Sequence, residues 1–157
     1  MSLSPLVAIS TVPVRFLAGV AGGVIATLAM DVVMARLPEG ETPPRIAAGV
    51  LTESPPTEAP GRLATVVHYL AGGLTGPLCV WLVFASAALF GGPTLPAILA
   101  AVGVLYLLMV GFFVVVVLPR SAVTATRVGA IRRDWAVAAA AYLVVLTPIV
   151  IVTFRVT

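Results

Sequence analysis

The sequence of 157 residues contains no lysine, one cysteine and one histidine, and few of its side chains are charged. Charged residues make up 10% of the chain and hydrophobic residues 61%, against about 25% and roughly 45–50% in soluble domains. No Asp, Glu or Arg occurs between Arg62 and Arg120, a run of 57 residues. A soluble domain needs polar side chains on the outer face of each element, so this run excludes a water-soluble globular fold and a disordered chain.

The scarcity of cysteine and histidine excludes several kinds of site. Cys79 is the only cysteine, so no intramolecular disulfide can form, and it lies in an apolar run where a thiol behaves as a small hydrophobe. A metal or haem site needs more ligands than one histidine and one thiol supply, so we expect no metal and no cofactor. The net charge of +3 comes without a basic stripe interleaved with aromatic residues, so no nucleic-acid partner is expected. Common catalytic motifs are also absent, which indicates a protein that is not an enzyme and has no catalytic residues.

Four apolar segments are long enough to cross a bilayer core, which takes about 20 residues in a helix. They cover residues 16–35, 63–90, 95–118 and 135–154. Their continuous apolar runs lack the two-residue alternation of barrel strands, so helices are expected. The sequence therefore predicts an all-α polytopic membrane protein, with four transmembrane helices in a single domain over residues 1–157 and the lipid bilayer as its surroundings.

The arginines predict the orientation of these spans. Four spans place both termini and the short link at 91–94 on one side, which holds Arg15 and Arg155, while the other seven arginines lie on the opposite side. An excess of arginine marks the cytoplasmic side, so loops 36–62 and 119–134 are predicted to be cytoplasmic and both termini extracytoplasmic. The second loop carries four arginines that we expect to contact anionic lipid headgroups: Arg120, Arg127, Arg132 and Arg133. Docking of an acidic partner is the alternative for this loop.

Local residues predict several details of the connections. Residues 43–51, between two Pro-Pro pairs, are expected to form two helical turns with Ile46, Val50 and Leu51 on the membrane surface. Thr94 is expected to cap the third span. The three tyrosines are interpreted as packing residues: Tyr69, Tyr106 and Tyr142.

Small residues recur at four-residue spacing in the first two spans. Gly19 and Gly23 lie on one face of the first span, and Gly72 and Gly76 on one face of the second. Such small-xxx-small surfaces let another helix backbone approach closely. Two interpretations remain open: the two spans pack together within one molecule, or the glycines form a homodimer face.

Asp31 is the only charged residue inside the predicted spans, and His68 is the only histidine of the chain. Asp31 precedes Arg36 by five residues and His68 follows Arg62 by six, so both lie roughly 8–9 Å inside the cytoplasmic boundary, at about 1.5 Å per residue. A carboxylate in hydrocarbon normally faces a partner or water. With Thr27 one turn before Asp31, these residues form the candidate intramembrane polar site.

Two interpretations of the pair of Asp31 and His68 remain open. It can be a structural hydrogen bond, with Arg36 or Arg133 as rival partners that reach in from the interface. It can also be a proton or ligand site, because an Asp–His pair can share a proton and histidine changes charge near neutral pH.

Residues 23–31 read G-x-x-A-T-x-x-M-D, and a Pro-Pro loop and then His68 follow. This pattern, over about the first half of the chain, resembles small four-helix membrane proteins of prokaryotes, including the YagU-like inner-membrane proteins. The resemblance implies a helical membrane protein that can be a dimer, and it implies no reaction. The lysine-free composition, rich in Ala, Val and Arg, is similar to that of GC-rich prokaryotes, so we expect the plasma or inner membrane of a prokaryote.

Two functions follow from these patterns. The first is a non-enzymatic integral membrane protein that acts as a small homo-oligomer or as an accessory subunit of a membrane complex, with a second copy or another membrane protein as partner. The alternative is a small transporter or proton-coupled permease that uses Asp31 and His68. A cavity that reaches both residues favours the alternative, whereas a dry, close-packed bundle favours the structural role.

Overall fold

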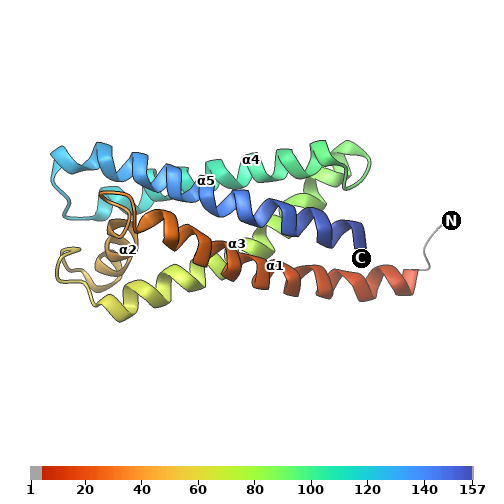
Figure 1. Cartoon of the computed structure of the whole chain (residues 1–157), viewed down its shortest axis with the longest axis horizontal. Helices are drawn as coiled ribbons and strands as arrows, with labels where there is room; N and C mark the ends of the chain where they lie inside the picture. Colours follow the sequence, from red (N-terminus) through yellow and green to blue (C-terminus); the bar gives the residue numbers. More distant parts are fainter. Residues whose placement is uncertain (1–4, 157) are drawn as a thin grey trace.

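The computed structural model describes the backbone of residues 5–156 and the side chains of residues 11–156. All regular elements of this part are helices: α1 (Pro5–Met34), α2 (Thr42–Thr52), α3 (Gly61–Phe90), α4 (Leu95–Phe112), the π-helical turn η1 (Phe113–Val117), the 3-10 turn η2 (Leu118–Arg120) and α5 (Ala125–Val156). Figure 1 shows the long helices side by side, with the short α2 at one end of the bundle.

Four helical segments are long and apolar enough to cross a membrane: Thr11–Met34, Gly61–Phe90, Leu95–Arg120 and Ala125–Val156. This confirms the all-helical prediction and the number of candidate spans. Helix α5 begins at Ala125, so much of the predicted cytoplasmic connection 119–134 is helical. The charged residues before position 135 set the predicted start of the apolar span. Ala, Arg and Ile are also compatible with a helix, so α5 extends beyond its apolar part.

The connections place the helix ends in two groups. The start of α1, the link between α3 and α4, and the end of α5 lie at one end of the bundle, while α2 and the connection from α4 to α5 lie at the other (Figure 1). The α3–α4 link is tight because Gly91 and Gly92 adopt φ angles of +74° and +144°, which glycine allows without strain. The side chain of Thr94 accepts a hydrogen bond from the Ala97 N–H, as predicted for the cap of α4.

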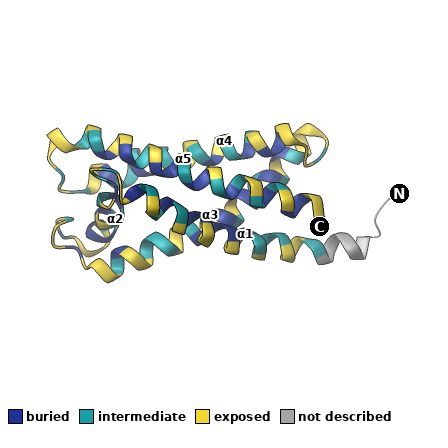
Figure 2. Cartoon of the chain, viewed as in Figure 1, coloured by how far each residue is buried: buried dark blue, intermediate teal, exposed yellow. Residues whose placement is uncertain are grey.

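The buried residues lie between the long helices and the exposed ones on their outer faces (Figure 2). The apolar core draws on all four long helices, for example Met30, Val83, Leu105 and Leu146. The outer faces are also apolar, and Leu17, Leu74, Leu107 and Val144 are among the large hydrophobic residues exposed there. Such a surface suits lipid, which covers apolar side chains without the cost they incur in water.

Helices α1 and α3 approach each other through the predicted glycines. A Cβ on Gly76 would lie 1.8 Å from the Gly19 carbonyl oxygen, and one on Gly23 would lie 2.5 Å from the Gly72 oxygen. Both distances are below 3.0 Å, closer than real Cβ atoms approach a neighbour, so only glycine fits. Of the two interpretations, packing within one molecule is therefore the one the structure contains, and these glycine faces are not free for a homodimer.

The prediction of a helix at 43–51 is confirmed by α2, but the predicted position of Ile46 on the membrane surface is wrong. Ile46 is fully buried in a second apolar cluster with Phe113, Leu118 and Ile131. Leu51 is exposed and Val50 is half-buried beside this cluster. Helix α2 thus packs against η1 and α5 through Ile46 and does not lie on the bilayer as a separate amphipathic segment.

Candidate functional site

Asp31, near the end of α1, forms hydrogen bonds with two consecutive residues of α3. His68 Nε2 lies 2.7 Å from Asp31 Oδ1, and the Tyr69 hydroxyl donates to Asp31 Oδ2 at 2.6 Å. The predicted contact between Asp31 and His68 is therefore present. The interpretation of Tyr69 as a packing residue is incomplete, and its place beside His68 in the sequence was the signal that could have found it.

The two rival arginines have other partners. Arg36 donates to the Val32 carbonyl oxygen at 2.7 Å, and Arg133 pairs with Asp134 at 2.9 Å. Within residues 11–156, Asp31 forms its side-chain hydrogen bonds with His68 and Tyr69 only. Each oxygen of the carboxylate thus has one donor, which offsets the cost of placing it in a membrane span.

The pair lies at the edge of the bundle and not in its dry centre. The Asp31 side chain is 38% exposed and the His68 side chain 11%. Both line a cavity of about 380 Å³ between the end of α1, the start of α2 and the start of α3; its lining is part polar and part apolar, and we call it the polar cavity. Its further lining residues are Met34, Glu41, Pro44, Arg45, Gly61, Ala64, Thr65 and Tyr69. A water molecule or a small polar group can therefore reach the carboxylate.

A second, apolar cavity of about 230 Å³ lies on the other side of His68. Residues from α1 to α5 line it, and most are apolar: Met30, Pro43, Pro44, Ala47, Val67, Ala71, Met109, Phe112, Phe113, Val117 and Trp135, with the polar Thr27, Thr75 and Tyr142. His68 and Pro44 line both cavities. His68 therefore stands where a polar and an apolar space meet.

The second ring nitrogen of His68 has no partner within the described part of the protein. Nε2 is bonded to Asp31, while Nδ1 has no hydrogen-bond partner within residues 11–156. Each buried side-chain nitrogen and oxygen in that part of the chain has a partner, so Nδ1 is accessible and not sealed in the core. When Asp31 is ionised and Nε2 donates to it, Nδ1 presents a lone pair; on protonation of the ring, Nδ1 becomes a donor. A carboxylate bonded to one ring nitrogen fixes the orientation of the imidazole.

Thr27 belongs to the helix packing more than to the polar cluster. Its hydroxyl donates to the Gly23 carbonyl oxygen at 2.8 Å, and the side chain is fully buried. A Cβ on Gly72 would lie only 1.9 Å from the Thr27 hydroxyl oxygen. The Tyr142 hydroxyl of α5 donates to the Gly72 oxygen at 2.6 Å and ties a third helix to this contact.

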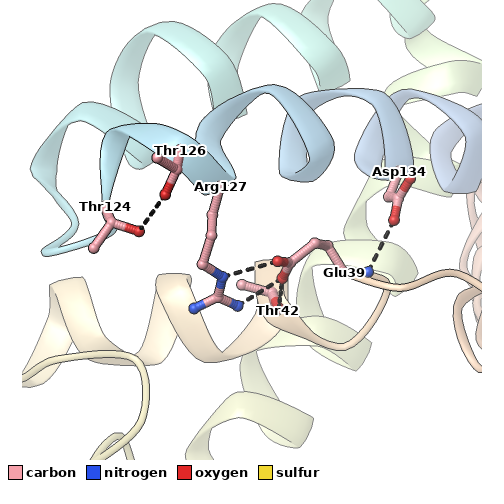
Figure 3. Close-up of polar contacts among 6 residues, drawn as sticks. All are labelled: Glu39, Thr42, Thr124, Thr126, Arg127 and Asp134. Carbon is pink, nitrogen blue, oxygen red and sulfur yellow. Dashed lines mark hydrogen bonds and ion pairs between the residues drawn. The ribbon is translucent and has the colours of Figure 1, made fainter.

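A polar network fastens the connection between α1 and α2 to α5, and the sequence pattern did not predict it. Asp134, fully buried, accepts the Glu39 backbone N–H at 2.8 Å (Figure 3). It also pairs with Arg133. The Glu39 carboxylate accepts two hydrogen bonds from Arg127, at 2.8 and 2.7 Å, and one from Thr42 at 2.6 Å. The guanidinium of Arg127 holds the pKa of Glu39 below its ordinary value of 4.5. We call these residues the loop anchor.

The loop anchor changes the interpretation of the four arginines near α5. Arg127 and Arg133 form ion pairs within the protein. Arg120 and Arg132 form no ion pair within residues 11–156, and the Arg120 guanidinium donates to the Val116 carbonyl oxygen, so contact of these two with lipid headgroups stays a prediction. The residues that the structure describes hold no group of three or more His, Cys, Asp or Glu side chains placed to bind a metal ion.

Comparison with known proteins found no match for this chain among protein-family models, curated proteins or solved structures.

Proposed function

We propose that this chain is a multi-pass protein of a prokaryotic cell membrane that binds a ligand at the pair of Asp31 and His68 without catalysing a reaction on it. One observation carries the proposal: the pair lines a cavity, and His68 keeps one ring nitrogen open while Asp31 holds the other. A purely structural hydrogen bond needs no cavity beside it and no accessible nitrogen.

Binding has better support than passage through the bundle. Both cavities lie near the α2 end, where His68 and Pro44 line each of them. Toward the opposite end, the space between the helices is filled by buried apolar side chains such as Val83, Leu146 and Val150. A transport path would need a polar lining in that region. The expectation of a homo-oligomer through the glycine faces loses its support because α1 and α3 use these faces on each other.

Native mass spectrometry of the protein, purified from its host membrane in a mild detergent, tests the proposal. The wild-type protein should retain a bound species as a discrete increase in mass. Asp31→Asn and His68→Gln should lose that increase, because they remove the carboxylate that orients the ring or the ring itself. Arg155→Gln, an exposed change at the opposite end of the bundle, is the matched control and should retain it.

A wild-type protein that carries no bound species overturns the proposal, and so does an equal mass increase in the wild type and both site variants. Melting curves in the same detergent show whether the variants are folded. If Asp31→Asn fails to fold, Tyr69→Phe provides a milder change to the same carboxylate.

A further inference from the structure

We infer that the ligand is a zwitterionic phospholipid that places an acyl chain in the apolar cavity and its headgroup in the polar cavity, with His68 at the junction. The inference rests on the proposed function, that the pair of Asp31 and His68 binds a ligand. It names the chemical class of that ligand.

The polar side-chain groups that line the apolar cavity are already bonded within the protein, apart from Nδ1 of His68. Thr27 and Thr75 donate to carbonyl oxygens of their own helices. The Tyr142 hydroxyl donates to Gly72, and the Trp135 indole N–H donates to the Met109 oxygen at 3.2 Å. The cavity therefore offers a ligand mainly carbon surface. A hydrocarbon chain gains from such a surface, whereas a polar ligand would lose its hydration without replacement.

The apolar cavity reaches the outer surface of the bundle. Phe112 lines it and is 62% exposed, and Ala71 on its rim is also exposed. Both belong to candidate membrane spans, α3 and the segment Leu95–Arg120, so lipid chains are the molecules that surround this opening. An acyl chain can enter from the bilayer without crossing water.

The polar cavity offers one unpaired charge of each sign besides the bonded Asp31. Glu41 and Arg45, at the start of α2, are exposed, and neither side chain has a hydrogen bond or ion pair within residues 11–156. The hydroxyls in the same lining are committed, Thr65 to Gly61 and Tyr69 to Asp31. A headgroup with a phosphate for Arg45 and an ammonium for Glu41 satisfies both charges, whereas a purely anionic headgroup would leave Glu41 beside a like charge.

The position of the two cavities matches the build of a phospholipid. They share the lining residues His68 and Pro44, so the two cavities adjoin, and a molecule that occupies both must pass beside these two side chains. The polar cavity lies at the helix ends beside α2, near most of the arginines, and the apolar cavity lies deeper between the spans. Headgroup and chain thus follow the polarity gradient of the bilayer itself.

Tryptophan fluorescence can test this inference, because Trp135 lines the apolar cavity and the only other tryptophan is Trp81. A Trp81→Phe protein in an uncharged detergent leaves Trp135 as the sole reporter. Phosphatidylethanolamine with brominated acyl chains is the probe, since bromine quenches a tryptophan that it contacts. Quenching should saturate near one lipid per protein. Brominated phosphatidylglycerol, an anionic lipid, is the control and should quench more weakly.

Two variants separate chain from headgroup. Ala47→Phe fills the apolar cavity from α2 and should abolish the saturable quenching. Arg45→Gln should raise the lipid concentration for half-saturation about 10-fold, the loss of one charge-assisted hydrogen bond. Arg132→Gln, an exposed arginine outside both cavities, should leave it unchanged.

The ¹⁵N resonances of His68, the only histidine, are followed in the same titration. Saturable quenching together with a shift of these resonances supports the inference. A shift without quenching retains a ligand at the pair but overturns the acyl chain in the apolar cavity. Quenching that rises without saturation, equally for both lipids and with no shift, shows ordinary surface lipid and overturns the inference. Tighter binding of phosphatidylglycerol overturns the zwitterionic headgroup.

Discussion

The carboxylate of Asp31 is stable in its position because two donors from one helix reach its two oxygens. His68 and Tyr69 are consecutive in α3, so their side chains leave the helix in different directions. Each still forms a hydrogen bond with a different oxygen of the Asp31 carboxylate. Loss of one donor leaves the other in place, and the carboxylate remains partly exposed to the polar cavity. We therefore expect coupling between Asp31 and each donor to be moderate.

A double-mutant cycle measures that coupling. Asp31→Asn and His68→Gln, separately and together, should show an interaction energy of about 0.5–2 kcal/mol in the free energy of unfolding in detergent, in the range of contacting pairs and of hydrogen bonds inside membranes. Asp31→Asn with Thr147→Ala, on the far part of α5, is the control and should be additive. Additive effects for Asp31 and His68 would contradict a bond that contributes to stability.

Helices α1 and α3 depend on glycine at specific points, and two glycines of similar chemistry provide a direct comparison. A Cβ on Gly76 would lie 1.8 Å from a backbone oxygen of α1, while a Cβ on Gly103 in α4 would have no atom within 4 Å. Gly76→Ala should lower the free energy of unfolding by about 1–3 kcal/mol, because the helices must separate. Gly103→Ala should leave it unchanged or raise it by up to about 1 kcal/mol, the helix-propensity gain. If the two substitutions change the melting temperature equally, α1 and α3 are farther apart at Gly76 than the structure shows.

Helix α2 is held by the loop anchor, which gives its attachment a defined pH dependence. The pKa of Glu39 is lower in the folded protein than its ordinary value of 4.5, because Arg127 donates to the carboxylate. The unfolded chain therefore binds the proton more readily, so this contribution to stability is complete above pH 4.5 and is lost as the pH falls through the lowered pKa.

Hydrogen exchange of the α2 amides checks this expectation. Protection in the wild type should decrease below pH 4.5, after correction for the intrinsic exchange rate, as Glu39 becomes protonated. Arg127→Gln should show low protection already at neutral pH and little further loss in acid. Arg132→Gln, an exposed arginine near the same helix end, is the matched control and should behave as the wild type. If protection of the α2 amides still decreases in acid in Arg127→Gln, a group other than Glu39 causes the pH dependence.

The sequence was informative where a property depends on depth or spacing along one helix. Counting residues from Arg36 and Arg62 was enough to place Asp31 and His68 at one level, and four-residue spacing identified the glycine faces. The sequence was less informative where a contact with a distant part of the chain determines whether a residue is buried. Asp134 is buried because it accepts the backbone N–H of Glu39, 95 residues away.

Ile46 and Tyr69 illustrate the same limit. The burial of Ile46 depends on Phe113 and Ile131, which belong to other helices. The bond from Tyr69 to Asp31 depends on how α3 is rotated about its axis relative to α1, and residue spacing in α3 does not determine that rotation. Single-helix patterns therefore located the candidate pair, but neither its second donor nor the two cavities beside it.

The arrangement of the helices leads to a prediction that tests the membrane topology and the orientation of the bundle separately. Residues 57 and 124 lie in the connections at the α2 end, while residue 93 lies in the α3–α4 link at the opposite end (Figure 1). The α2 end holds seven of the nine arginines, so we expect it to face the cytoplasm. In intact cells, Pro93→Cys should therefore react with a membrane-impermeant maleimide, and Thr57→Cys and Thr124→Cys only after permeabilisation.

All three positions are exposed, and the native Cys79 is buried, so the wild-type protein is the unlabelled control. The two kinds of failure differ. If Thr57→Cys and Thr124→Cys react in intact cells while Pro93→Cys is protected, the four spans are retained and the arginine rule gives the wrong side. If Thr57→Cys and Thr124→Cys differ from each other, the number of crossings between them is odd, and α3 with the segment Leu95–Arg120 does not form a membrane-spanning hairpin. Only equal protection of these two, with Pro93→Cys labelled, agrees with both the bundle and its proposed orientation.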